Sequence, residues 1–232
     1  MHIKPFLLTS DNFTPLQRTP WAGSRIMERY KPSIPAGSDP SRVGESWEIS
    51  MGPEFPSRCA ESKRPLAELI AEAPEAFLGA EARAGRTLSA LLVKLLDAGD
   101  DLSVQIHPRD DYVGLAPDEA GKPESWYVLD ASPGAGVYLG LRPGTTPEVM
   151  AECLRADDQS VATLLNFIPL AAGDFILVEA GMPHAIGKGI TVIEPQVVLP
   201  GRKGVTYRYW DWNRRYDDWN RRRNNNRRNW PW

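Results

Sequence analysis

Two of the three histidines in this 232-residue chain lie in sequence contexts that could bind a metal ion. His107 follows Gln105 in the run Leu102-Ser-Val-Gln-Ile-His-Pro108, which has the character of a strand ended by proline. Because side chains on a strand repeat every second residue, Gln105 and His107 share one face. We therefore expect an amide oxygen and an imidazole at a strand end, where both can reach one cation.

His184 stands in a second informative segment. In Gly173-Asp-Phe-Ile-Leu-Val-Glu-Ala-Gly-Met-Pro-His184, a strand is expected to lead through a turn at Ala180-Gly181 into a strand that begins with the histidine. The spacing of its glycines and histidine resembles the second cupin motif, with Glu179 in place of the motif's proline.

The first cupin motif has two ligands two residues apart and then a glutamate, and the pair Gln105 and His107 followed by Glu124 fits it. Each of these residues taken alone has an ordinary structural explanation, as a core histidine or an ion-paired glutamate. Together with His184 they form a complete ligand set of nitrogen and oxygen atoms. Such a set suits zinc and also Mn, Fe, Co or Ni, and the sequence leaves this choice open.

The surrounding pattern is that of a β protein. Pro74 is expected to divide the helical periodicity of residues 65–78 into two helices, and Thr146-Pro147 to open a helical stretch over 147–167. Apolar runs of strand length are separated by turn residues; they are Ser46–Ser50, Leu91–Leu96, Leu102–Ile106, Trp126–Leu129, Val137–Leu141, Phe175–Val178, Ile190–Ile193 and Val205–Trp210. This order predicts a mainly β fold, a cupin-type β-sandwich or jelly-roll barrel with a few decorating α-helices.

Charge divides the chain into two parts. Residues 211–232 contain seven Arg and three Asp, whereas the other 210 residues contain 20 basic and 27 acidic side chains. The pattern predicts a metal-binding domain over residues 1–210 and a basic, disordered Arg/Asn/Trp tail over 211–232.

Composition also bears on location and partners. No apolar run reaches the length of a membrane span, and the apolar stretch at the N-terminus is too short for a signal peptide. Cys59 and Cys153 lie far apart without metal or redox spacing, which predicts a reducing cytoplasm. The acidic body argues against nucleic acid as a partner, and the oligomeric state is left open.

A closer resemblance covers residues 17–217. The chain resembles the type I mannose-6-phosphate isomerases of the cupin superfamily in Gly44-Glu-Ser-Trp-Glu-Ile-Ser50, Gln105-Ile-His-Pro108, Lys122-Pro-Glu124, Pro183-His-Ala-Ile-Gly187 and Thr206-Tyr-Arg208. The order and spacing of these segments make the combination specific. The resemblance implies a metal-dependent aldose–ketose isomerase that interconverts mannose 6-phosphate and fructose 6-phosphate through an enediol(ate).

The family's zinc ligands correspond to Gln105, His107, Glu124 and His184. Its active-site arginine corresponds to Arg208, and Lys122 is the lysine before the glutamate ligand. Lys94 and Ser103 match positions associated with the phosphate end of the substrate. Each of these roles is implied by the resemblance.

Glu194, in Val192-Ile-Glu-Pro-Gln196, is the candidate base, because Arg208 stays protonated and cannot accept a proton. A salt bridge between Glu194 and Arg208 is the alternative. A second hypothesis for the whole chain is a non-catalytic cupin that binds a sugar or sugar phosphate, its activity lost with further strands that family members have after Thr206-Tyr-Arg208.

Overall fold

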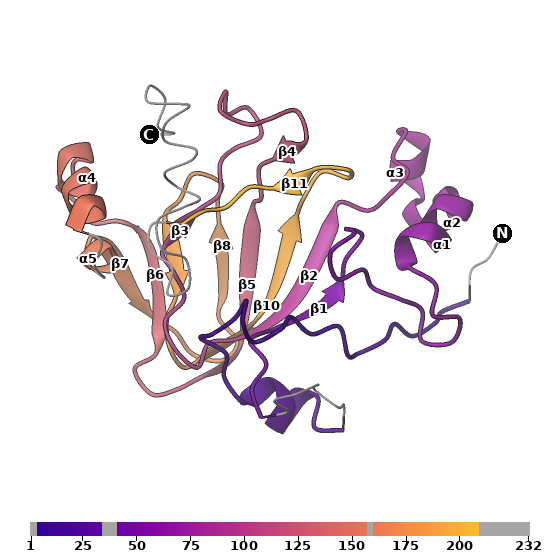
Figure 1. The fold of residues 1–232 in the computed structure, drawn as a ribbon, viewed down its shortest axis with the longest axis horizontal. Helices are drawn as coiled ribbons and strands as arrows, with labels where there is room; N and C mark the ends of the chain where they lie inside the picture. The colour runs from indigo at the N-terminus through magenta and orange to yellow at the C-terminus, as the bar shows by residue number, and fades with distance from the viewer. Residues whose placement is uncertain (1–3, 34–40, 157–159, 209–232) are drawn as a thin grey trace.

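Two antiparallel sheets pack face to face in the computed structural model, which describes residues 4–33, 41–156 and 160–208. Figure 1 shows the sheets side by side, with short helices at the two ends of the sandwich. The mainly β fold expected from the alternating apolar runs is therefore confirmed.

Each sheet has five strands. The first has the order β1-β2-β10-β5-β8 and consists of β1 (Glu45–Ile49), β2 (Leu91–Asp97), β10 (Ile190–Val197), β5 (Glu124–Ala131) and β8 (Phe175–Val178). The second has the order β12-β3-β9-β6-β7 and consists of β12 (Tyr207–Arg208), β3 (Gln105–Ile106), β9 (His184–Ile186), β6 (Gly136–Leu141) and β7 (Leu165–Pro169). A short parallel pair, β4 (Glu119–Ala120) with β11 (Lys203–Gly204), lies beside them.

The helices are short and cover outer surfaces. A π-helical turn, Ile26–Tyr30, packs Ile26 and Met27 against Leu95, which alternates with the inward-facing residues of β2. The helices α1 (Leu66–Glu72), α2 (Pro74–Leu78) and α3 (Ala80–Arg83) form a separate lobe, while α4 (Pro147–Ala156) and α5 (Ser160–Thr163) lie beside β7 (Figure 1). No helix in the described ranges is long and apolar enough to cross a membrane.

Most element predictions are confirmed, with two exceptions. The strand expected over Leu102–Ile106 is limited to β3, Gln105–Ile106. Pro74 separates α1 from α2 as expected, and Phe175–Val178 is a strand with the expected bounds. The helical prediction for 147–167 is wrong at its end, because residues 165–167 belong to β7 and pair with β6. There the pairing with a neighbouring strand overrides a local apolar spacing that also fits a helix. The tail predicted over 211–232 lies outside the described residues.

The interior of the sandwich changes from apolar to polar along its length. Inward-facing side chains run Val192, Glu194 and Gln196 along β10, and Val128, Trp126 and Glu124 along β5, all buried. The apolar end forms the main core, where each fully buried Val or Leu contributes roughly 1.5–3 kcal/mol. At the other end of the same strands, polar and charged side chains face the interior and lie next to that core.

The apolar end is closed by a clamp around Asp97. Its carboxylate accepts hydrogen bonds from the backbone N–H of Arg25 (2.7 Å) and from Thr191 Oγ1 (2.7 Å). The Arg25 guanidinium donates to the carbonyl of Gly189 and to Ser132 Oγ. The clamp ties the N-terminal segment to the end of β2 and the start of β10.

We expect Gly23→Ala to destabilise the fold, because a Cβ at this position would lie 2.1 Å from Asp97 Oδ2. Asp97 would have to leave its two donors, at a cost of about 3 kcal/mol in the free energy of unfolding. Urea unfolding followed by circular dichroism measures the change. Gly52→Ala is the control, since its Cβ would meet nothing closer than 3.9 Å. Equal stabilities of the two variants would contradict the clamp.

Candidate metal centre

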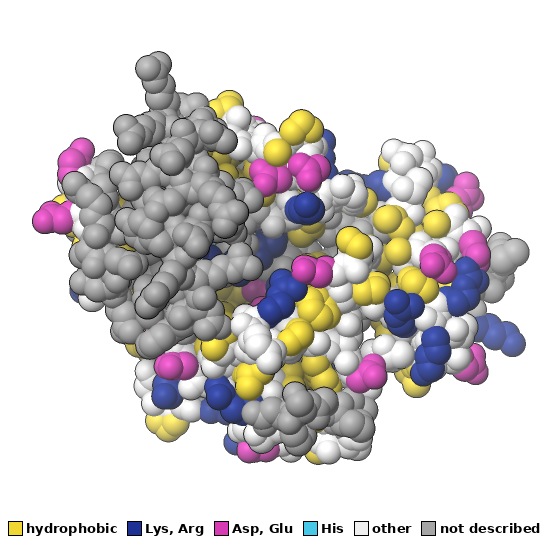
Figure 2. All heavy atoms as spheres, viewed as in Figure 1, with side chains coloured by type: hydrophobic (Ala, Val, Ile, Leu, Met, Phe, Trp, Pro, Cys, Tyr) yellow, Lys and Arg dark blue, Asp and Glu magenta, His cyan; other side chains and the backbone are white. Residues whose placement is uncertain are grey.

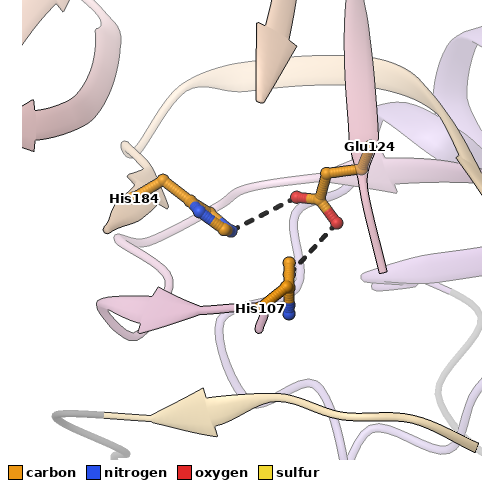
Figure 3. A group of neighbouring side chains, drawn as sticks. All are labelled: His107, Glu124 and His184. Carbon is orange, nitrogen blue, oxygen red and sulfur yellow. Dashed lines mark ion pairs between the residues drawn. The ribbon is translucent and has the colours of Figure 1, made fainter. Parts of the chain in front are cut away.

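A carboxylate and two imidazoles meet at the polar end of the interior. Glu124 of β5 points between the sheets, with Oε1 3.3 Å from His184 Nε2 and Oε2 3.2 Å from His107 Nε2 (Figure 3). One ligand atom from each of the three residues lies within 4.8 Å of the others. All three side chains are buried, and no histidine is visible on the face of the molecule drawn in Figure 2.

A tight turn positions His184 next to His107. Gly181 occupies the turn with φ of +90°, a left-handed conformation that favours glycine. Its N–H donates to the carbonyl of His107 at 2.7 Å. The imidazole of His184 then packs edge-on against Trp126, with the ring centroids 5.5 Å apart. The turn predicted at Ala180-Gly181 is therefore confirmed.

Backbone carbonyls fix the tautomer of both imidazoles. His107 Nδ1 lies 3.1 Å from the carbonyl of Val205, and His184 Nδ1 lies 2.8 Å from that of Met182. A carbonyl only accepts, so Nδ1 carries a proton in each ring, and in the neutral imidazole Nε2 then keeps its lone pair. Burial also lowers the pKa of His107 to about 3, which keeps its ring neutral.

Three atoms of this His/Glu/His group have no hydrogen-bond donor or cation to interact with. The lone pairs of two Nε2 atoms face a carboxylate, and His107 Nε2, His184 Nε2 and Glu124 Oε1 are buried without a hydrogen-bond partner. Buried polar atoms left in this way cost free energy, about 1–3 kcal/mol each. A divalent cation accepts all three lone pairs, so the residues present fit a metal ion, and their nitrogen and oxygen atoms suit zinc.

Gln105 lies beside this group. On β3 it is directly opposite His184 of β9, and cross-strand partners present their side chains on the same face. Arg208 of β12 is opposite Gln105 on the other side, with an exposed side chain. The predicted role of Gln105 as a fourth ligand stays a prediction, as does the role of Ser103, which is half-buried two residues earlier.

Two buried lysines and a glutamate flank the carboxylate. Lys122 Nζ lies 3.6 Å from Glu124 Oε2, and Lys94 Nζ lies 3.5 Å from Glu194 Oε2, its cross-strand partner. The alternative sequence interpretation paired Glu194 with Arg208, whereas the structure pairs it with Lys94. Trp126 Nε1 donates to Glu194 Oε1 at 3.2 Å.

Burial and charge set the protonation of these groups. Burial, together with the charge of Glu124, raises the pKa of Glu194 to about 7 despite the nearby lysines. Burial lowers the pKa of Lys122. Burial opposes ionisation of Glu124, but the charge of Lys122 holds its pKa well below its usual range. Glu194 can therefore gain or lose a proton near neutral pH.

The sequence interpretation missed two members of the cluster. Gln196 Nε2 donates to Glu124 Oε2 at 2.6 Å, and Glu45 accepts from Trp47 Nε1 while its charge raises the pKa of Lys94 against the effect of burial. Strand alternation from Glu194 could have indicated Gln196, since the two lie on one face of β10. Nothing in the pattern around Glu45 separates it from a solvated acidic face.

The fold and the site together define a cupin-type protein with a buried His/Glu/His group between two antiparallel sheets. The family model for the catalytic domain of type I phosphomannose isomerase matches residues 14–126. The chain belongs to this family, as the resemblance predicted.

Known relatives agree with this assignment. A mannose-6-phosphate isomerase of Streptococcus mutans is 37% identical over 198 residues, covering 84% of this chain and 58% of its own length. The crystal structure of mannose 6-phosphate isomerase from Bacillus subtilis superposes with a TM-score of 0.74 at 30% identity, covering 93% of this chain and 64% of that one. A mannose 6-phosphate isomerase bound with zinc and yttrium, 17% identical, shares the fold with a TM-score of 0.61, covering 88% of this chain and 69% of that one. The chain thus spans less than two thirds of the curated relative.

Metal addition is expected to stabilise the protein. At a free zinc concentration one hundred times the dissociation constant, the free energy of unfolding should rise by about 2.7 kcal/mol. Differential scanning fluorimetry with zinc and then with a chelator measures this gain and its reversal. His184→Ala should abolish the gain, and His2→Ala is the control for unspecific binding to a histidine. An equal shift in His184→Ala and the unaltered protein would place the metal elsewhere.

Proposed function

We propose that the chain is a metal-dependent isomerase that interconverts mannose 6-phosphate and fructose 6-phosphate. The observation that carries the proposal is the group of Glu124, His107 and His184, buried beside Glu194, a carboxyl whose pKa is near 7. The reaction moves one proton from C2 to C1, which needs a base near its operating pH and a way to stabilise an oxyanion.

The charges around the group favour an anionic substrate. Lys94, Lys122, Glu124 and Glu194 are buried, and the half-buried Glu45 lies close enough for its charge to affect the pKa of both lysines. With both lysines charged and Glu194 ionised, as its role as the base requires, these five side chains carry a net charge of −1. A divalent cation would then leave a net charge of +1, which favours an anionic sugar phosphate.

His107, Glu124 and His184 would hold the cation, with Gln105 as the fourth ligand. When bound, the cation supplies a Lewis acid that polarises the substrate's oxygen atoms. We propose zinc because the donor set suits it and because a relative of the same fold is described as bound with zinc and yttrium. Other first-row metals would suit the same donors.

Glu194 is proposed as the base. Its ionised carboxylate would take the proton from C2 of open-chain mannose 6-phosphate and return it to C1, while the proton of the O2 hydroxyl passes to O1. Its side chain is held on one oxygen by Trp126 and lies beside Lys94, so it can change protonation without leaving its place.

The remaining charged residues would bind the substrate. Lys94 and Ser103 are proposed to contact the phosphate, and Arg208 to stabilise the enediolate, since it stays protonated. Lys122, whose pKa is lowered by burial, could hold an oxygen or pass a proton. With two free cysteines and this substrate class, we place the protein in the cytoplasm, acting on a small molecule and not on nucleic acid.

Turnover of the purified protein tests the function. With zinc present, we expect fructose 6-phosphate to form from mannose 6-phosphate. In heavy water, the deuterium content of the product measures how far the abstracted proton exchanges with solvent. Chelator should remove the activity, and His107→Ala should lower it at least 100-fold. Tight binding of the sugar phosphate without turnover would favour the non-catalytic cupin instead.

Replacing the base should separate chemistry from metal binding. Glu194→Gln keeps the size of the side chain but cannot accept a proton, so kcat should fall by roughly 10²–10⁴ while zinc affinity is retained. Glu48→Gln is the matched control, because the carboxylate of Glu48 pairs with Lys31 at 2.6 Å. Similar kcat values for the two variants would remove Glu194 from the mechanism.

The pH profile gives a second measurement of the same group. The base works only when deprotonated, so the rate should fall as pH is lowered through its pKa. That pKa is raised to about 7 by burial and by Glu124, and a bound cation would lower it. We expect an acid limb at or below pH 7 in kcat/KM. A rate independent of pH between 5 and 8 would contradict the assignment.

A further inference from the structure

Gln196 lies directly opposite Glu124 on the neighbouring strand. The two residues are register partners on β10 and β5, and both face the interior. Gln196 is 1% exposed, and its Nε2 donates to Glu124 Oε2 at 2.6 Å. Because a carboxylate oxygen only accepts, this contact also fixes which end of the amide faces Glu124.

The two oxygens of Glu124 have different surroundings. Oε2 accepts a hydrogen bond from the amide of Gln196 at 2.6 Å, with His107 Nε2 3.2 Å and Lys122 Nζ 3.6 Å away. Oε1 is buried without a hydrogen-bond partner, 3.3 Å from His184 Nε2. The terminal torsion of a glutamate is broad and two-fold, so without a donor on one oxygen the carboxylate would be free to turn. The donor on Oε2 opposes that rotation and leaves Oε1 as the oxygen without a hydrogen bond.

We propose that Gln196 is a positioning residue that makes Glu124 a single-oxygen ligand. Its amide holds Oε2, so that Oε1 alone is presented to the cation together with the imidazoles of His107 and His184. The inference rests on the proposed metal centre. A neutral amide suits this place because it donates a hydrogen bond without adding charge, whereas an ionised glutamate would repel Glu124.

Gln196→Met tests the inference, since methionine has a similar volume and no donor. Apo protein is titrated with zinc against a competing chelator, and the Co²⁺-loaded form is examined by visible absorption. We expect a 10–100-fold weaker affinity, the size seen when a partner of a metal ligand is removed, and altered Co²⁺ bands, because Glu124 can rotate.

Thr191→Val is the matched control. Thr191 lies on the same strand, is fully buried, and donates to a carboxylate, Asp97 Oδ1, at 2.7 Å. Asp97 is not one of the ligands, so this variant should unfold at a lower temperature with unchanged metal affinity and unchanged Co²⁺ bands. A purely structural role of Gln196 would give the same result as this control.

The failures can be told apart. If the unaltered protein binds no metal, the proposed metal centre itself is wrong. If it binds metal and Gln196→Met has the same affinity and spectrum, the inference is overturned while the metal centre stands. Should Gln196→Met not fold, a crystal structure of the zinc-loaded unaltered protein decides. Both Glu124 oxygens on zinc, or Gln196 turned away from Oε2, would overturn the inference.

Discussion

The structure depends on keeping one carboxylate, that of Glu124, ionised inside a β-sandwich. An isolated buried carboxylate is strongly disfavoured, so every element around it contributes a compensating group. Lys122 supplies charge and Gln196 supplies a donor, while His107 and His184 bring lone pairs that require a cation. The strands that carry these groups are held by the apolar core at the other end of the same sheets. The free energy gained by apolar packing at one end of the sheets therefore offsets the free energy lost by burying charged groups at the other end.

The division of the interior also explains how two carboxyl groups behave differently. Glu124 is held ionised by the cationic neighbour beside it, whereas Glu194, buried against Trp126 and close to the charge of Glu124, has a pKa raised to about 7. Two neighbouring carboxyl groups whose pKa values differ in this way can have separate roles, one as a ligand and one in proton transfer. The strands place these groups together, since Trp126 and Glu124 share the inward face of β5, and Glu194 and Gln196 share the inward face of β10.

Much of the fold could be predicted from the sequence because its strands are bounded by strong turn residues. Pro74 and the Gly181 turn act locally, so their effects were readable from the chain. The end of the helix expected over 147–167 was not, because residues 165–167 have an apolar spacing that fits either state and only pairing with β6 decides. Strand alternation likewise put Gln105 and His107 on one face but could not say what lies across from them.

The sequence by itself determined the types of ligand atom, their order along the chain and the family, since motif spacing is a local property. Only the tertiary structure decided which groups meet. It paired Glu194 with Lys94 instead of Arg208, and it placed Gln196 on Glu124 and Glu45 beside Lys94. These contacts depend on the register between strands, because the residues they join are 49 to 100 positions apart in sequence. Register follows from the packing of whole sheets and from no single segment.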